Sequence, residues 1–354
     1  MGFLLDNKTI VVTGGTGSLG KVLTKRLLSG KNGKPKKIII FSRDEAKQHF
    51  MRLEYQQKAK ATDEIIYKNF EQLLEFRIGD IRSYSSVCSV LKHADVVINA
   101  AALKQVPTCE YFPYEAVQTN ITGAENIVKA IHDNDYPVKI VVGVSTDKAC
   151  KPINVMGMTK ALQERVFITA NLTNPNTRFV CVRYGNVLAS RGSVIPLFHQ
   201  QIQNGGPLTI TDPNMTRFLM PLEKAVDTIL KAIEEANKGE TYIPRISTAN
   251  MLDVAKVLID KRNIKIEITG LRPGEKMYEE LISYEESCRT VKRGEYFAIK
   301  PMLPELCKKE KTKTLNKEFT SNDSLMSLNE IRELFEANKL LIGQNIVEEG
   351  EFLR

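Results

Sequence analysis

The chain has 354 residues, which is enough for one large domain or two interleaved ones. Basic residues outnumber acidic ones by 50 to 42, but they are scattered and no nucleic-acid-binding motif accompanies them, so nucleic acid is not an expected partner. The six cysteines lack C-x-x-C spacing and the four histidines do not cluster, so we expect no metal site.

The N-terminal segment "MGFLLDNKTIVV" has no basic region followed by a long apolar run, so we expect no signal peptide. No apolar stretch reaches about 18 residues, the length that spans a bilayer. Isolated cysteines fit the reduced thiols of cytosolic proteins. The sequence therefore predicts a cytoplasmic protein with no membrane partner.

The first half alternates short apolar runs with helical patterns. The apolar runs predict strands at residues 8–14, 36–43, 75–81, 94–102, 138–146 and 177–187. Helical periodicity predicts helices at residues 17–30, 111–134 and 154–172. Apolar strands separated by helices indicate a parallel sheet covered on both faces. We therefore expect an α/β fold, a doubly wound parallel Rossmann sheet with a smaller substrate-binding domain and a C-terminal extension.

A glycine-rich turn follows the first predicted strand. In "TGGTGSLG", Gly14, Gly17 and Gly20 lie between that strand and the helix it leads into, which is the context of a nucleotide site. Glycines let the backbone approach a pyrophosphate, and a helix N-terminus favours its charge. We expect this turn to bind a dinucleotide, with Thr16, Ser18 and Leu19 as further contacts.

The end of the second strand, "FSRDE", bears on the choice of cofactor. Ser42 and Arg43 come first, and a guanidinium can pair with a 2′-phosphate, so we favour NADP over NAD. The alternative is that Arg43 points to solvent and Asp44 binds the ribose, which would favour NAD. Further contacts are expected from the loops after later strands, at Asp80, Ile81, Ala100, Ala101, Ala102 and Lys104.

The pattern changes after residue 187. The segment 188–212 mixes helix with Gly and Pro turns, which fits a smaller lid over a substrate. Asn186 is expected at the end of the sixth strand, where it could contact a diphosphate oxygen. Arg191, Arg217 and Arg272 are candidate anion clamps, since diphosphate favours bidentate guanidinium contacts, although any one of them could be structural.

The sequence pattern divides the chain into three predicted segments. We expect residues 1–185 to form the NADP-binding domain, completed by parts of 217–250, and residues 186–290 to form mainly the substrate-binding domain. Residues 291–354 form a C-terminal extension with one helix near 327–341. This extension is either a solvated tail or an arm that packs across a neighbouring subunit.

Several motifs together resemble the extended short-chain dehydrogenase/reductase family. They are "TGGTGSLG", "GDI", "NAAALK", "STDK", the lysine of a degraded Y-x-x-x-K, and "RYGNV". Within that family the chain looks most like the UDP-N-acetylglucosamine 4,6-dehydratases, and its tail resembles their configuration-inverting branch. The closer match rests on "STDKACKPINVMGMTKA", "RYGNVLASRGSVIPLF", "MTRFLM" and "GLRPGEKMYEELIS".

The resemblance implies a reaction and a set of catalytic residues. Such enzymes oxidise carbon 4 of the hexose, remove the proton of carbon 5, and expel the hydroxyl of carbon 6 as water. Thr146, Asp147 and Lys148 would supply the proton chemistry, with Asp147 as the acid at carbon 6 and Lys148 as the carbon 5 base. A base must be neutral, so we expect burial to lower the pKa of Lys148. The alternative is a surface Asp147–Lys148 pair.

Met156 stands where most relatives have a tyrosine, four residues before Lys160. The resemblance assigns Lys160 to the nicotinamide ribose. A thioether cannot exchange a proton, so Met156 cannot deprotonate the 4-hydroxyl. Either the enzyme is inactive at this step or another group acts. We favour Asp147, relayed through Thr146, with Met156 packing against the sugar or the nicotinamide.

The resemblance also assigns substrate contacts. Arg217, Arg272 and Glu275 would hold the phosphates and the uridine ribose, with further contacts from Lys104, Asn186, Val194 and Arg191. The expected activity is UDP-N-acetylglucosamine 4,6-dehydration with inversion at carbon 5, in a homo-oligomer, either a dimer or a hexamer. The alternatives are a retaining 4,6-dehydratase, a UDP-hexose 4-epimerase, or a protein that binds NADP without turnover.

Overall fold

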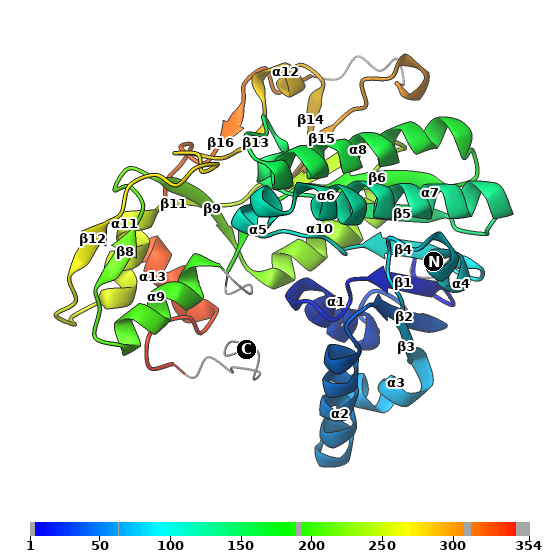
Figure 1. Ribbon diagram of the computed structural model, residues 1–354, viewed down its shortest axis with the longest axis horizontal. Helices are drawn as coiled ribbons and strands as arrows, with labels where there is room; N and C mark the ends of the chain where they lie inside the picture. The colour runs from blue at the N-terminus through cyan, green and yellow to red at the C-terminus, as the bar shows by residue number, and fades with distance from the viewer. Residues whose placement is uncertain (1–3, 63, 189–192, 308–312, 345–354) are drawn as a thin grey trace.

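The computed structural model describes residues 4–62, 64–188, 193–307 and 313–344, and a nine-stranded sheet lies at its centre (Figure 1). The strands from β3 to β10 in spatial order are parallel, and a β14–β15 hairpin continues the sheet antiparallel. This confirms the predicted doubly wound Rossmann sheet. In spatial order the strands are β3 (Leu74–Ile78), β2 (Lys37–Ser42), β1 (Thr9–Thr13), β4 (Val96–Asn99), β5 (Ile140–Val144), β6 (Arg178–Val182), β10 (Thr241–Pro244), β15 (Tyr296–Ile299) and β14 (Thr290–Arg293).

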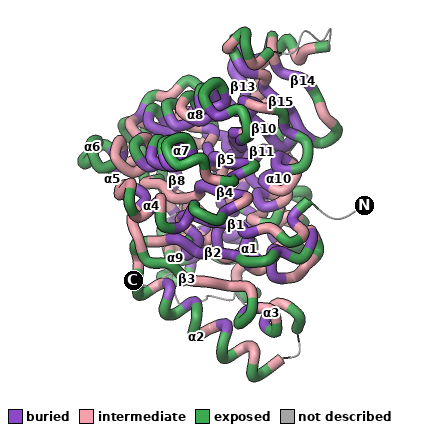
Figure 2. Tube along the Cα trace, turned by 90° about the vertical axis from the view of Figure 1, so that its right-hand side faces the viewer, coloured by how far each residue is buried: buried purple, intermediate pink, exposed green. Residues whose placement is uncertain are grey.

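Helices cover both faces of this sheet. The central strands are buried along their whole length, as their continuous apolar sequence requires (Figure 2). On one face lie α1 (Ser18–Leu28), α2 (Glu45–Ala61), α3 (Ile65–Leu73) and α10 (Leu222–Glu235). On the other lie α4 (Tyr84–Leu91), α7 (Gly123–Asn134) and α8 (Val155–Thr173). Each face therefore has its own apolar core.

The long helix expected at 111–134 is broken into pieces. The structure has α5 (Val106–Tyr111), α6 (Pro113–Ala116), a π-helical turn at Val117–Thr122, and then α7. The wide turn contains Asn120, which is fully buried. Its side chain binds the backbone N–H and C=O of Leu103 and donates to the Thr159 hydroxyl. Tertiary hydrogen bonds to Asn120 thus coincide with the break, as is common where π turns occur.

A smaller lobe lies beside the carboxyl end of the sheet (Figure 1). It contains the strands β7 (Asn186–Val187), β9 (Thr216–Met220) and β11 (Thr248–Asn250), and the pair β8 (Leu208–Ile210) and β12 (Ile266–Ile268). Its helices are α9 (Val194–Gln203), α11 (Met251–Ile259) and α13 (Leu328–Ala337). Apart from β7, these elements contribute to one apolar cluster, separate from the two cores of the sheet.

The segment from residue 284 returns to the main sheet before it reaches the small lobe. After α12 (Tyr284–Ser287), β14 and β15 extend the sheet, so the first part of the predicted C-terminal extension is a sheet edge. β16 (Phe319–Thr320) then pairs with β13 (Glu280–Ile282), and α13 packs against α11. Ile331 and Phe335 of α13 are fully buried there. The tail helix thus packs on its own chain.

No helix in the described part of the chain combines the length and the apolar character that a bilayer crossing demands.

Candidate active site

A cavity of about 1190 Å³ lies between the sheet and the small lobe. Residues that follow β1, β2, β4 and β5 line it, so it opens at the carboxyl ends of parallel strands and at the point where strand order reverses. Arg191 lies outside the described residues, and every other predicted site residue lines this cavity. These are Gly14, Thr16, Gly17, Ser18, Leu19, Gly20, Ser42, Arg43, Asp80, Ile81, Ala100, Ala101, Ala102, Lys104, Thr146, Asp147, Lys148, Met156, Lys160, Asn186, Val194, Arg217, Arg272 and Glu275.

The glycines of the first turn differ in what an added Cβ atom would meet at each position. Gly14 has φ +65° and a Cβ there would lie 2.8 Å from the Cα of Ala101, so packing alone requires glycine. A Cβ on Gly20 would lie 2.3 Å from the Gly15 carbonyl oxygen, which fixes the close start of α1. A Cβ on Gly17, by contrast, would come no closer than 3.4 Å to any neighbour. The space in front of Gly17 therefore belongs to the cavity, as a phosphate-binding turn requires.

The end of β2 presents Ser42, Arg43 and Asp44 to the cavity. The Ser42 hydroxyl lies 3.1 Å from the Thr16 hydroxyl and orders the turn. Asp44 caps α2: its Oδ1 accepts from the Lys47 backbone N–H, and its Oδ2 lies 2.8 Å from the Lys47 ammonium. The Arg43 guanidinium lies 3.9 Å from the carboxylate of Asp80 and its side chain is 57% exposed. Both carboxylate oxygens of Asp44 thus contact Lys47, whereas the Arg43 guanidinium stays largely exposed.

Asp80 and Ile81 form the neighbouring wall. Burial would raise the pKa of the Asp80 carboxyl, but hydrogen bonds from Arg82 lower it below its usual range. The Ile81 carbonyl accepts from the Asn126 side chain, which fixes the loop against α7. The Asp80 carboxylate is thus paired with Arg82, and the loop that forms this wall is held in place by hydrogen bonds.

The centre of the cavity holds Thr146, Asp147 and Lys148, directly after β5. Asp147 is 1% exposed, and its Oδ1 accepts from the Thr146 hydroxyl at 2.8 Å and from the Lys148 ammonium at 3.1 Å. Its Oδ2 is buried and has no hydrogen-bond partner among the described residues. Such an atom is costly unless a ligand meets it. The pair is therefore not a surface ion pair.

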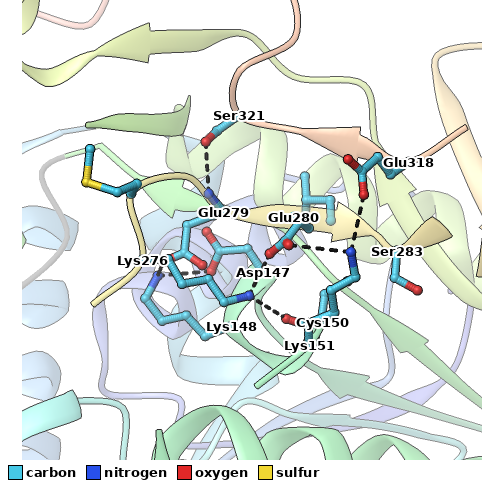
Figure 3. A network of polar contacts seen from close by, with 12 residues as sticks. Asp147, Lys148, Cys150, Lys151, Lys276, Glu279, Glu280, Ser283, Glu318 and Ser321 are labelled. Carbon is cyan, nitrogen blue, oxygen red and sulfur yellow. Dashed lines mark hydrogen bonds and ion pairs between the residues drawn. The ribbon is translucent and has the colours of Figure 1, made fainter. Parts of the chain in front are cut away.

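Lys148 has a second acidic neighbour, Glu279, whose Oε1 lies 3.1 Å from the ammonium (Figure 3). Burial alone would lower the pKa of Lys148, but the carboxylates of Asp147 and Glu279 raise it above its ordinary value. The predicted lowering of the Lys148 pKa is therefore wrong in direction, because two opposite charges within hydrogen-bond distance outweigh desolvation.

Glu279 is the site residue that the sequence reasoning missed. It is 2% exposed, lines the cavity, and stands in the motif "GLRPGEKMYEELIS". Burial raises its pKa above the ordinary value and the Asp147 carboxylate adds to this, although the Lys148 ammonium opposes it. The only signal in the sequence was a pair of adjacent acidic residues at the start of a short apolar run.

Met156 and Lys160 follow on α8, whose N-terminus is capped by the Asn154 side chain. Met156 is 5% exposed and packs with Cys109 and Ala116 in a small apolar cluster at the cavity wall. The Lys160 ammonium donates to Gln163 Oε1 at 2.6 Å, and burial lowers its pKa from 10.5 to about 8.

The prediction that Asn186 ends the sixth strand is wrong. β6 ends at Val182, and Asn186 opens β7, which pairs with β9 in the small lobe. The chain crosses between sheets at Gly185, where a Cβ would lie 2.3 Å from the Phe218 Cβ. Asn186 still reaches the cavity, and its Oδ1 is buried with no partner among the described residues.

The remaining substrate candidates lie on the small-lobe side. Val194 is the first residue of α9. Arg217 donates to the backbone carbonyls of Thr216, Lys276 and Met277, so it also ties β9 to the following loop. In that loop the Glu275 Oε2 is buried with no partner among the described residues. The cavity therefore has several polar side chains that could bind a large polar ligand.

Comparisons with known proteins place the chain in a family. The family model described as "Polysaccharide biosynthesis protein" matches residues 10–301. The UDP-glucose 4-epimerase of Rickettsia conorii is 43% identical over 341 residues, which cover 93% of this chain and 95% of that protein.

Solved structures agree on the fold. The X-ray structure of Pen from Bacillus thuringiensis matches with a TM-score of 0.84 at 36% identity, over 95% of this chain and 99% of Pen. The dTDP-glucose 4,6-dehydratase of Streptomyces venezuelae matches with a TM-score of 0.64 at 19% identity, over 76% of this chain and 86% of that one. Its likeness shows the shared Rossmann-type fold. The chain belongs to the polysaccharide biosynthesis protein family.

Proposed function

We propose that this protein is an NADP-dependent UDP-N-acetylglucosamine 4,6-dehydratase that inverts carbon 5. Its product would be a UDP-2-acetamido-2,6-dideoxy-4-keto-hexose of L-arabino configuration, for surface polysaccharide synthesis. The observation that carries the proposal is the hydrogen-bonded Thr146–Asp147–Lys148 cluster, with Asp147 buried at its centre, which lines a cavity of about 1190 Å³ together with the expected dinucleotide contacts. A dehydratase needs both an acid and a base at adjacent carbons, and this cluster supplies both types of group.

A bound nicotinamide would supply the redox chemistry, by taking a hydride from carbon 4 and returning one to carbon 6. The protein must then move protons at three atoms: the 4-hydroxyl, carbon 5 and the departing oxygen of carbon 6. Asp147 would serve the first and third, since the residue lines the cavity and its buried Oδ2 has no hydrogen-bond partner among the described residues. Thr146, which donates to the other carboxylate oxygen, would hold the orientation of Asp147.

Lys148 would act at carbon 5. Its side chain is 22% exposed, and the ammonium is held at the cavity by the two carboxylates. Met156 would exclude water beside the reacting carbons, since it lies in an apolar cluster at the cavity wall. Lys160 would orient the nicotinamide ribose through hydrogen bonds from its ammonium.

Arg43 supports NADP over NAD. Its guanidinium is exposed at the end of β2, where an adenosine 2′-phosphate would lie, while both carboxylate oxygens of Asp44 are occupied by Lys47. The open space in front of Gly17 fits a pyrophosphate. Homo-oligomerisation stays part of the proposal by resemblance alone.

A second candidate is a UDP-hexose 4-epimerase, which the name of the relatives at 43% identity favours. An epimerase moves a hydride off carbon 4 and back to it, so it needs no group at carbon 5. Lys148, with Glu279 beside it, would then have no proton to move at carbon 5. Met156 adds a second objection, since that reaction commonly uses a tyrosine at this position as the base for the 4-hydroxyl.

Proton NMR in heavy water separates the candidates. The purified protein would be incubated with NADP and UDP-N-acetylglucosamine, and in parallel with UDP-glucose. A new carbon 6 methyl signal with deuterium at carbon 5 is the expected result, and ring couplings would distinguish inversion from retention. A galacto-configured product that keeps its carbon 6 hydroxyl would establish the epimerase. Cofactor binding without any product would establish the non-catalytic alternative.

Asp147→Asn tests the assignment of the acid. We expect turnover to fall by about 100-fold or more while the Michaelis constant changes by no more than about three-fold, because the amide keeps the shape but cannot exchange the proton. Turnover near that of the wild type would contradict the role of Asp147. Steady-state kinetics on the same methyl-forming reaction measures both quantities.

A further inference from the structure

Glu279 completes a charge cluster that the proposed chemistry has not yet used. The Lys148 ammonium lies 3.1 Å from Asp147 Oδ1 and 3.1 Å from Glu279 Oε1 (Figure 3). Both carboxylates are nearly inaccessible, and each keeps one buried oxygen with no partner among the described residues. The Lys148 ammonium is shared between these two buried carboxylates, with Arg217 as a second nearby cation, and each carboxylate keeps an oxygen that can take up a proton.

The backbone holds Glu279 in place. Its N–H donates to the Ser321 hydroxyl at 2.9 Å, and its carbonyl accepts from the Ser321 N–H at 2.8 Å. The next residue, Glu280, turns to different partners and pairs with Lys276 at 2.6 Å and Lys151 at 3.7 Å. Successive side chains near a strand point to opposite sides, so only Glu279 lines the cavity.

We infer that Glu279 is a positioning residue that holds the Lys148 ammonium and takes its proton, so that Lys148 can act as a neutral amine at carbon 5. This inference rests on the proposed dehydratase function. It resolves a conflict in that function: a lysine tied to two carboxylates is a poor base unless one of them can accept its proton.

The proton transfer balances without any added reagent. One N–H bond of the Lys148 ammonium breaks as an O–H bond forms on Glu279, so an ion pair becomes an amine and a carboxylic acid. The amine lone pair then takes the carbon 5 proton, and the electrons of that C–H bond move towards the carbon 4 carbonyl. Carbon 5 then takes a proton from solvent on its opposite face, as inversion requires. Glu279 releases its proton to solvent, so the pair returns to its charged state.

The surroundings of Glu279 favour this exchange. Asp147 and Lys148 face it from the turn after β5, and Arg217 faces it from β9. Burial raises the pKa of Glu279, which makes it a better proton acceptor than an exposed glutamate. Because the Lys148–Glu279 contact is already at hydrogen-bond distance, the proton moves without rearrangement of the chain.

Glu279→Gln tests the inference, with Glu280→Gln as the matched control on the adjacent buried carboxylate. At pH 7 we expect Glu279→Gln to lower kcat by about 100-fold or more with little change in KM. The loss should shrink between pH 7 and 9.5, because Lys148 without this carboxylate releases its proton to solvent at lower pH. Glu279→Asp should recover part of the rate, and Glu280→Gln should keep the pH profile of the wild type.

A second measurement does not depend on turnover. Competitive labelling of Lys148 with acetic anhydride, followed by mass spectrometry, gives the pH at which its amine becomes reactive. That midpoint should move to lower pH in Glu279→Gln and stay unchanged in Glu280→Gln. If the wild type forms no methyl product but this midpoint still moves, the dehydratase function is wrong and the Lys148–Glu279 coupling stands. An unchanged midpoint, or a kcat loss equal at every pH, would overturn the inference.

Discussion

At the scale of one residue, the buried charge of Lys160 lowers the free energy of unfolding of the protein. The side chain is 5% exposed, and burial lowers its pKa from 10.5 to about 8. Below pH 8 both the folded and the unfolded chain carry this proton, so the folded state bears the full cost of a buried charge, about 3 kcal/mol. Between pH 8 and 10.5 the unfolded chain binds more protons, so stability at this residue rises with pH.

Lys160→Met should therefore stabilise the protein while it abolishes turnover. We expect a gain of about 1–2 kcal/mol at pH 7, after the loss of the hydrogen bond to Gln163, and a smaller gain at pH 9.5. Urea unfolding of the cofactor-free protein at both pH values measures this. The exposed Lys92→Met is the control and should change stability little at either pH. A destabilised Lys160→Met at pH 7 would contradict the argument.

A residue that directly follows a strand could be placed at the cavity from the sequence. Thr146, Asp147 and Lys148 were found because they stand in one motif at the end of β5. Glu279 could not be found in this way, because it reaches Lys148 from a segment far along the chain, just before β13, and only the folded chain brings the two together. The pKa of Lys148 depends on that contact, so the sequence could not predict whether this pKa is raised or lowered.

At the scale of elements, a buried arginine links the end of β6 to the helices α8 and α12. Arg183, directly after β6, lies 2.7 Å from Glu164 of α8 and 2.8 Å from Glu286 of α12. Glu286 also closes the capping box that starts α12. Burial would raise the pKa of Glu286, but Arg183 lowers it to about 2, so this carboxylate stays charged at neutral pH.

Arg183→Met should destabilise the protein by about 3–5 kcal/mol, because it leaves the buried carboxylate of Glu164 without this cation and that of Glu286 with only Arg289, at 3.7 Å. Chemical denaturation at pH 7 measures the change. The triple variant that adds Glu164→Gln and Glu286→Gln removes the stranded charges and should recover a large part of the loss. If the triple variant were as unstable as the single one, the cost would come from lost packing and not from unpaired charge.

The elements themselves were predictable where their pattern was continuous. All six expected strands of the first half have counterparts in the structure, since each contains a short apolar run, and the first five are followed by a helix before the next strand. Two helices between β2 and β3 were not predicted: α2 buries only Gln48, Met51 and Tyr55 along its length, so its periodicity is weak. The π turn at Val117–Thr122 depends on tertiary hydrogen bonds to Asn120, which no local pattern reveals.

At the scale of the whole molecule, the C-terminal tail packs against the small lobe through α13. α13 packs against α11, and Phe335 is fully buried in the apolar cluster that also holds Val254 and Leu258. The same lobe carries the predicted substrate contacts at Val194 and Arg217. The tail should therefore support the substrate side of the cavity more than the cofactor side.

Phe335→Ala tests this division of the molecule. Loss of a fully buried aromatic ring should cost about 3–5 kcal/mol in urea unfolding, and the affinity for UDP should fall more than the affinity for NADP. Phe50→Ala, at a 59% exposed ring on α2, is the control and should change stability by no more than about 0.5 kcal/mol. If the tail acted instead as an arm between subunits, Phe335→Ala would lower the sedimenting mass and leave UDP affinity per subunit unchanged. Equilibrium binding and sedimentation on the same samples distinguish the two outcomes, because packing of α13 within one chain predicts a loss of affinity even where the mass is constant.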